Sequence, residues 1–300
     1  MLPEADELPD VLLDLAVPHE DVNGLVALRD RLWEDPQARW LLDRCVDALV
    51  RDMGRPGGNP GFPVLPDGLG ELGRCFCVYV YVAALPYVRE YHRGRGIPDE
   101  VSRRTLADLG RHLAVHRRAR GGRGLAVPDW PGLHFRGELY QLGRLQFQRA
   151  VLGGRMGGAT AGAGHAAGPG DPCLNLHITD FRGPLSPEAC DRAIDLAREF
   201  FARHFPEERY ETAVCHSWLL DPQLRDYLPA DSNIVRFQER FRPADGYGQE
   251  PDDSTPVGFV FGDRALSVDR LSRRTTVERA VGDHLRSGGH WYGGHGWFPL

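Results

Sequence analysis

The sequence predicts an α+β protein with a helical N-terminal part, followed by a mixed, largely antiparallel β-sheet flanked by helices. Two observations predict this architecture. Apolar residues recur at helical spacing over the first 125 residues, whereas short apolar segments separated by turn residues make up the remainder. A chain of 300 residues also suits two domains of ordinary size. We therefore expect a helical domain over residues 1–128 and a sheet domain over residues 129–300.

The helices of the N-terminal part are predicted from their ends and their apolar spacing. Asp35-Pro36 combines an N-cap residue with a proline at the first helical position, and apolar residues follow with helical period up to Met53. Gly54 then ends this helix. The segment Cys75–Leu85 is apolar on both faces, which fits either a strand or a buried helix, and we favour the helix. Pro98 opens a further helical stretch.

The C-terminal part alternates candidate strands with two helices. Ser186 caps the first helix and Pro187 begins it, and the helix is expected to end near His204. The second is expected from about Thr275 to Leu285. The candidate strands are the segments 139–151, 173–178, 210–220, 234–242 and 257–261.

The segment from Gly153 to Gly170 is dominated by small residues, with eight glycines and five alanines. Such a composition buries little apolar area against the entropy cost of ordering the chain. The segment also lacks the GK[ST] ending of a phosphate-binding loop and is followed by a predicted strand. We therefore expect a flexible insertion.

Charge and composition exclude several classes of function. The net charge of −6 argues against a nucleic-acid partner. All 36 basic residues are arginine, which excludes Schiff-base chemistry on a lysine. The N-terminus is acidic, and no apolar stretch reaches the 18 to 20 residues of a membrane span, so we expect neither a signal peptide nor a membrane partner.

The cysteine and histidine patterns indicate reduced thiols and no metal. The six cysteines are scattered without a CxxC pair, which predicts a cytoplasmic protein with free thiols. His290 and His295 have no acidic or cysteine residue beside them, so aromatic packing of the C-terminus is the preferred interpretation. His112 and His116 lack the glutamate of an HExxH motif and precede two arginines, which fits a solvated helix face.

Two histidines on separate candidate strands are the strongest candidates for chemistry. Cys215 and His216 are adjacent, so on a strand they point to opposite faces and cannot form a thiol–imidazole pair. His216 and His177 could instead reach one site from two strands. A neutral imidazole there would act as a general base near pH 7. A half-buried strand with a structural histidine is the alternative.

Alternation between Leu142 and Gln148 predicts a strand with one polar face. Leu145 and Phe147 share one face, and Arg144, Gln146 and Gln148 share the other. The polar face is either solvated or lines a ligand groove. In the groove, Arg144 would meet a phosphate or carboxylate.

Five short motifs occur in order along the C-terminal half. They are Leu142-Gly143-Arg144-Leu145-Gln146-Phe147, Leu176-His177-Ile178, Gly183-Pro184-Leu185, Cys215-His216-Ser217-Trp218 and Ser232-Asn233-Ile234. Together they resemble a bacterial family of acyltransferase-domain proteins, in which a helical N-acyltransferase N-terminal domain precedes a GNAT-like C-terminal domain. The resemblance covers most of residues 130–300 and, more loosely, the helical half.

The resemblance implies an acyl-CoA-dependent N-acyltransferase. Acyl-CoA would be the co-substrate, and an unknown small-molecule amine would be the acceptor. His216 or His177 would take the proton of the amine, while backbone amides polarise the thioester carbonyl. The residues expected to bind substrate or cofactor are Arg144, Gln146, Ser217, Trp218 and Asn233.

One departure from the family pattern keeps two alternatives open. The nearest match to the R/Q-x-x-G-x-G/A pyrophosphate turn, Arg242–Gly248, is one residue too long and precedes three acidic residues. Arg286–Gly289 follows a predicted helix and does not precede one. The first alternative is therefore a non-catalytic protein that binds a small molecule or peptide on a GNAT-like scaffold. A hydrolase that uses Cys215 is the second, although nothing nearby activates that thiol.

Overall fold

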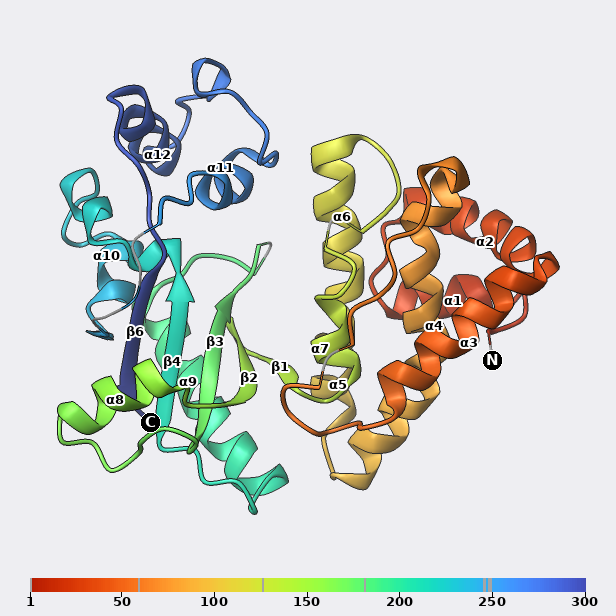
Figure 1. Ribbon diagram of the computed structural model, residues 1–300, viewed down its shortest axis with the longest axis horizontal. Helices are drawn as coiled ribbons and strands as arrows, with labels where there is room; N and C mark the ends of the chain where they lie inside the picture. Colours follow the sequence, from red (N-terminus) through yellow and green to blue (C-terminus); the bar gives the residue numbers. More distant parts are fainter. Residues whose placement is uncertain (1, 59, 126, 181, 245–246, 248–249) are drawn as a thin grey trace. The chain divides into compact units, whose positions relative to one another are not determined.

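The structure is a computed structural model that describes all residues except 1, 59, 126, 181, 245–246 and 248–249. The chain divides into two compact units, Met1–Gln141 and Leu142–Leu300 (Figure 1). The first unit is helical, and the second carries a sheet with helices. The predicted α+β class, with a helical domain before a mixed, largely antiparallel sheet, is confirmed.

The first unit is built from seven α-helices among its described residues. They are α1 (Leu8–Asp14), α2 (His19–Glu34), α3 (Pro36–Val50), α4 (Glu71–Gly94), α5 (Asp99–Leu106), α6 (Asp108–Arg120) and α7 (Pro131–Phe135). The side chain of Asp35 caps α3 by accepting from the backbone N–H groups of Gln37 and Ala38, as predicted. The short helix α7 belongs to this unit because Phe135 is fully buried in the helical core.

Helix α4 is the centre of the first unit. The segment that could have been a strand or a buried helix is therefore helical, as favoured, and it is longer than expected. By length and composition α4 could cross a membrane, but 72% of its most apolar window is buried inside the protein. The hydroxyl of Tyr81 donates to the carbonyl oxygen of Pro128 at 2.6 Å. These contacts are those of a core helix.

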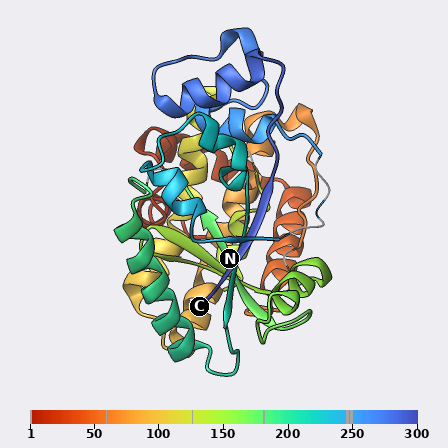
Figure 2. The same ribbon diagram turned by 90° about the vertical axis from the view of Figure 1, so that its left-hand side faces the viewer.

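The second unit contains most of a sheet with the strand order β1-β2-β3-β4-β6-β5 (Figure 1). The strands are β1 (Leu139–Leu142), β2 (Leu145–Val151), β3 (Pro172–Ile178), β4 (Thr212–Ser217), β5 (Arg242–Pro243) and β6 (Gly294–Pro299). Strands β3 and β4 pair in parallel, and the β2–β3, β4–β6 and β5–β6 pairs are antiparallel. Figure 2 shows β6, in dark blue, running to the C-terminus.

Helices cover both faces of this sheet. They are α8 (Gly154–Gly162), α9 (Pro187–His204), α10 (Asn233–Gln238), α11 (Ser254–Phe261) and α12 (Thr276–Arg286). Helix α9 lies on the face that carries Arg149, whose guanidinium stands 4.2 Å from the Phe205 ring at the end of that helix. Helix α8 packs on the opposite face, where Met156 joins Cys173 and Trp297 in one apolar cluster.

Several predicted strands are wrong. Residues 234–242 and 257–261 were expected as strands, but they form most of α10 and α11. Their β-branched and aromatic content suggested strands. At the start of α10, however, the Ser232 side chain accepts from the N–H of Val235, and this N-cap favours a helix. The predicted strand 139–151 is a hairpin that turns at Gly143, which has φ of +60°.

The C-terminal segment forms a central strand. Aromatic packing was expected there, and Trp297 is indeed buried, but β6 also pairs with β4 along its whole length. Its glycines hid the strand pattern, because glycine is depleted in most strands. Gly294 and Gly296 are required by close contacts. A Cβ at Gly296 would lie 2.7 Å from Cβ of Phe241, and one at Gly294 would lie 2.5 Å from the Leu220 carbonyl carbon.

The segment 153–170 is not the flexible insertion that its composition predicted. It contains α8, and Thr160 of that helix is fully buried. The Thr160 hydroxyl donates to the carbonyl oxygens of Gly157 at 2.9 Å and Ala167 at 2.7 Å. A Cβ at Gly157 would lie 2.3 Å from the backbone nitrogen of Pro169, so the glycine permits close packing of helix and loop.

Candidate active site where β3 and β4 separate

The parallel strands β3 and β4 pair only over a short stretch. Their register joins Leu174 to Ala213 and Asn175 to Val214, and it ends there although both strands continue. The strands separate toward their C-terminal ends (Figure 1). Beyond this point the facing backbone groups of the two strands do not form a ladder with each other. This is the only interruption in the pairing of two long neighbouring strands among the described residues.

The separation places the two predicted histidines on opposite sides of one opening. If the β3–β4 register continued for two more residues, His177 would face His216. Both side chains lie on the same face of the sheet, because His177 has the parity of Asn175 and His216 has the parity of Val214. The hypothesis that two strands bring two histidines to one site is consistent with this register.

His177 is held by the polar face of β2. Its Nε2 lies 2.9 Å from Oε1 of Gln148, and Nδ2 of Asn175 lies 3.5 Å from the same oxygen. Gln146 faces His177 directly across the β2–β3 ladder. The predicted polar face of this strand is therefore present, and it surrounds the imidazole with uncharged amides.

His216 belongs to a stack of three rings. It packs on His295 of β6 with ring centroids 4.0 Å apart, and His295 packs on Tyr247 with centroids 3.6 Å apart. Burial lowers the pKa of His295 to about 4, and the neighbouring His216 and Arg155 add to this effect. His295 is therefore neutral at pH 7, and sequence reasoning missed it because only the β4–β6 register brings it to His216.

The loop after β3 leads into the N-terminus of α9. Residues 179–186 join the two elements, and Ser186 caps the helix by accepting from the N–H of Ala189 at 3.3 Å. The first turn of α9 begins with Pro187, which has no N–H, and it carries Glu188, whose pKa is lowered by hydrogen bonds with its own backbone N–H and with Ser186. The sequence-predicted candidate for a pyrophosphate turn, Arg242–Gly248, lies partly outside the described residues.

Arg144 lies near this helix start. It occupies the β1–β2 turn and not the polar strand face that was predicted. Its Nε and Nη1 atoms are buried, and they have no hydrogen-bond partner among the described residues. Burial lowers the pKa of Arg144, Cys190 of α9 and Asp180 raise it, and Arg182 lowers it further. A buried guanidinium with unused donors is suited to hold an anionic ligand.

The remaining predicted site residues have mainly structural surroundings. Ser217 accepts from the N–H of Leu219 at 3.1 Å and so caps a short 3-10 helix. Trp218 is packed in the apolar cluster of α12 and its neighbours. Asn233 is exposed at the start of α10. Gln146 is fully buried on the β2 face described above.

The geometry does not support Cys215 as a nucleophile. The thiol is buried, and this burial raises its pKa to about 12. It also points to the sheet face opposite His216, as the sequence predicted. Nor do the described residues contain a group of three or more side chains suited to bind a metal ion.

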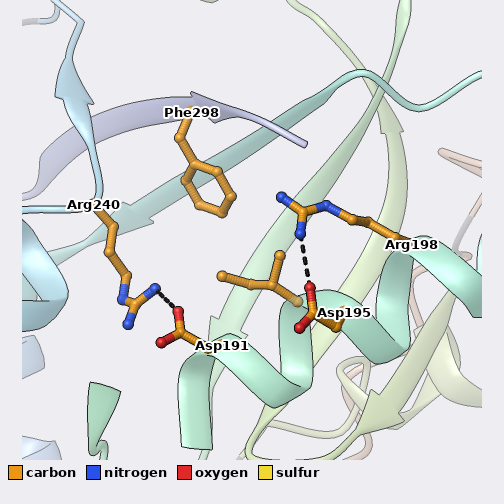
Figure 3. A pocket seen from close by; sticks show the side chains of 6 residues that line it. Asp191, Asp195, Arg198, Arg240 and Phe298 are labelled. Carbon is orange, nitrogen blue, oxygen red and sulfur yellow. Dashed lines mark hydrogen bonds and ion pairs between the residues drawn. The ribbon is translucent and has the colours of Figure 1, made fainter. Parts of the chain in front are cut away.

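A surface pocket of about 360 Å³ lies along α9 (Figure 3). Ile194 and Phe298 contribute apolar walls. Each of its two arginines forms an ion pair with an aspartate of α9. Arg240 pairs with Asp191 at 2.5 Å, and Arg198 pairs with Asp195 at 2.8 Å. The pocket therefore lacks a free positive charge of its own, unlike the surroundings of Arg144.

Two family models match the chain over nearly its full length. The N-acyltransferase N-terminal domain matches residues 6–137, and the GNAT-like C-terminal domain matches residues 139–298. The chain belongs to the acyltransferase family that combines these domains. The predicted resemblance is confirmed.

Crystal structures of acyltransferases are similar to the whole chain. One, of a variant in complex with octanoyl-CoA, is 40% identical over 100% of this chain and 90% of its own, with a TM-score of 0.90. Another, with decanoyl-CoA and teicoplanin, is 40% identical over the same shares, with a TM-score of 0.89. A third, with decanoyl-CoA, is 38% identical over 100% of this chain and 89% of its own, with a TM-score of 0.90. A search of curated proteins gives no match.

These comparisons confirm the predicted class of function. The chain is an acyl-CoA-dependent acyltransferase of the GNAT-like kind. The alternative of a non-catalytic scaffold rested on a missing pyrophosphate turn, whereas the family match and the acyl-CoA complexes of similar proteins favour an acyltransferase.

Proposed function

We propose that the chain transfers a medium-chain acyl group from CoA to an amine of a glycopeptide-type acceptor, with His177 as the general base. The separation of β3 from β4 is the observation that carries this proposal. It opens the sheet next to His177 and next to the N-terminus of α9. Similar acyltransferases bind octanoyl-CoA, decanoyl-CoA and teicoplanin, which supports the choice of donor and acceptor.

The donor would lie between the separated strands. The β3–β4 register ends at Asn175, and the backbone of β3 on that side would bind the pantetheine arm and polarise the thioester carbonyl. The pyrophosphate would bind beside the N-terminal end of α9, where Arg144 would donate its buried N–H groups.

His177 is preferred to His216 as the base. The Nε2–H group of His177 donates to Oε1 of Gln148, so the lone pair of the neutral ring is on Nδ1, and this is the atom that would take the proton of the amine. His216 is stacked on His295, which favours a role in shaping the acceptor side of the site. The amine nitrogen would attack the thioester carbonyl, and CoA would leave as its thiol.

Replacement of His177 tests the base. For His177→Ala we expect kcat with decanoyl-CoA and teicoplanin to fall by about 100-fold to 10,000-fold, because the variant lacks a positioned base. The Kd of decanoyl-CoA, measured by calorimetry, should stay within about threefold of the wild-type value, since the ring does not hold the donor. His216→Ala is the matched variant on the other strand and should retain more activity.

Binding of CoA tests the donor site separately. CoA at 100 times its Kd should raise the free energy of unfolding by about 2.7 kcal/mol. Loss of this stabilisation in Arg144→Leu, with partial recovery in Arg144→Lys, would support the assigned pyrophosphate site. No binding of CoA or decanoyl-CoA up to millimolar concentration would refute the mechanism.

A further inference from the structure

Gln148 is the direct hydrogen-bond partner of His177 and comes from a neighbouring strand. In the β2–β3 register Gln148 faces Asn175, and His177 lies diagonally across, so the two side chains meet over the sheet surface. Oε1 of Gln148 is 2.9 Å from Nε2 of His177 and 3.5 Å from Nδ2 of Asn175. Two side chains with N–H groups thus approach one oxygen.

We propose that Gln148 is a positioning residue for acyl transfer: it accepts the Nε2–H of His177 and so fixes the tautomer whose Nδ1 receives the proton of the amine. This inference rests on the proposed role of His177 as the base. A free imidazole exchanges its proton between both nitrogens, and only one tautomer presents a lone pair on a given side. Gln148 holds that tautomer and also limits rotation of the ring.

The choice of an amide over a carboxylate has a chemical consequence. A carboxylate at this position would stabilise the imidazolium and raise the pKa of the base. Gln148 orients the ring through a hydrogen bond to an uncharged amide. Asn175 contributes a second hydrogen bond to the same oxygen and keeps the amide from turning.

The titratable and charged groups near His177 come from β4, β6, α8 and the loop after β3. Strand β2 presents uncharged Gln146 and Gln148, and the same face of β4 presents His216. Beyond His216 the face carries His295 and, from α8, Arg155. The loop after β3 adds Asp180 and Arg182. Glutamate at position 148 would place a carboxylate within hydrogen-bond reach of Nε2 of His177.

The tautomer can be measured in the wild-type protein without any acceptor. Nitrogen NMR of histidine-labelled protein above pH 8, with His177 assigned by its loss in His177→Ala, should show a proton on Nε2 and a bare Nδ1. A proton on Nδ1 would overturn the proposal, whatever the activity of the variants.

Two substitutions of Gln148 test its effect on the pKa of His177 and on kcat. In Gln148→Glu the NMR pKa of His177 should rise by about one unit, and the acidic limb of the kcat/KM profile should move to higher pH by the same amount. Gln148→Leu should lower kcat on the order of 100-fold by misplacing the ring, with KM for decanoyl-CoA unchanged. The matched control is Gln37→Glu, which adds the same charge on the exposed start of α3 and should alter neither readout.

The outcomes separate this inference from the proposed function. If His177→Ala is inactive but Gln148→Glu leaves the pKa of His177 unchanged, the base is correct and the positioning role is wrong. If His177→Ala is fully active, His177 is not the base, and the proposed mechanism itself fails.

Discussion

At the scale of single residues, the site is defined by which neighbours each imidazole meets. His177 meets an amide, and His216 meets another imidazole. The first contact orients a base, whereas the second builds a stacked surface with Tyr247 at its far end. Neither partner is adjacent in sequence, so the two histidines look alike in the sequence and differ only in the folded chain.

The neutral state of the half-buried His295 predicts how stability depends on pH. Its pKa is lowered from 6.5 to about 4 in the folded protein, so between these values the unfolded chain takes up a proton that the folded chain does not. The free energy of unfolding should therefore fall as the pH drops from about 6.5 to about 4. Urea unfolding at pH 7 and pH 5 measures this loss.

His295→Phe keeps a ring in the stack and removes the titrating group. The variant should lose less stability than the wild type between pH 7 and pH 5. His92 in the first unit, whose pKa burial also lowers to about 4, contributes equally to both proteins and cancels in the comparison. Equal losses in the two proteins would show that His295 is not held neutral.

At the scale of elements, local caps determine where helices begin, and close contacts determine how they pack. Ser186 caps α9 at the position where the anion site is proposed, and Thr160 fastens α8 to its following loop. The first contact was predicted from the sequence, because an N-cap followed by proline is a local signal. The second was missed, because its acceptor at Ala167 is reached only when the loop folds back.

Two substitutions of Ser186 distinguish its role in helix capping from the proposed binding of an anion. Ser186→Ala should cost about 1 kcal/mol of stability by removing the cap. Ser186→Asp keeps a capping oxygen and should retain stability, but its charge would repel the CoA pyrophosphate. We expect the Kd of CoA in Ser186→Asp to rise about tenfold, or about 1.4 kcal/mol. An unchanged Kd would place the pyrophosphate elsewhere.

Thr160 tests whether α8 is a stable element. Thr160→Val removes a buried hydroxyl that donates to two carbonyl oxygens, and it should lower the free energy of unfolding by about 1 to 2 kcal/mol. Thr160→Ser retains the hydroxyl and is the matched control. If Thr160→Val is as stable as the wild type, the segment is as loosely held as its composition suggested.

At the scale of the whole molecule, the two units match two different family models, and both are needed for the family assignment. The donors seen with similar acyltransferases carry chains of eight and ten carbons. Octanoyl-CoA has six more methylenes than acetyl-CoA. If half of them are buried, at about 0.8 kcal/mol each, octanoyl-CoA gains about 2.4 kcal/mol of transition-state stabilisation over acetyl-CoA.

We therefore expect kcat/KM for octanoyl-CoA to exceed that for acetyl-CoA by about 50-fold. The measurement is release of free CoA thiol with teicoplanin as acceptor, and butyryl-CoA should fall between the two. A preference for acetyl-CoA would contradict the assignment of a medium-chain donor, although it would leave the acyltransferase class intact.

The sequence by itself determined the elements whose signals are local. The caps at Asp35 and Ser186 located α3 and α9, and alternation between Leu142 and Gln148 located a strand with Gln146 and Gln148 on one face. Order of motifs along the chain also sufficed to suggest the family. These features depend on residues within a few positions of one another, so they can be predicted from the sequence without knowledge of the fold.

Only the tertiary structure decided what depends on partners far apart in the chain. Strand β6 was hidden by its glycines, yet it pairs along β4 and brings His295 to His216. The point where β3 leaves β4 and the bond between Gln148 and His177 are likewise set by register. A register joins residues through hydrogen bonds between strands, and no spacing within one strand encodes where its neighbour begins or stops.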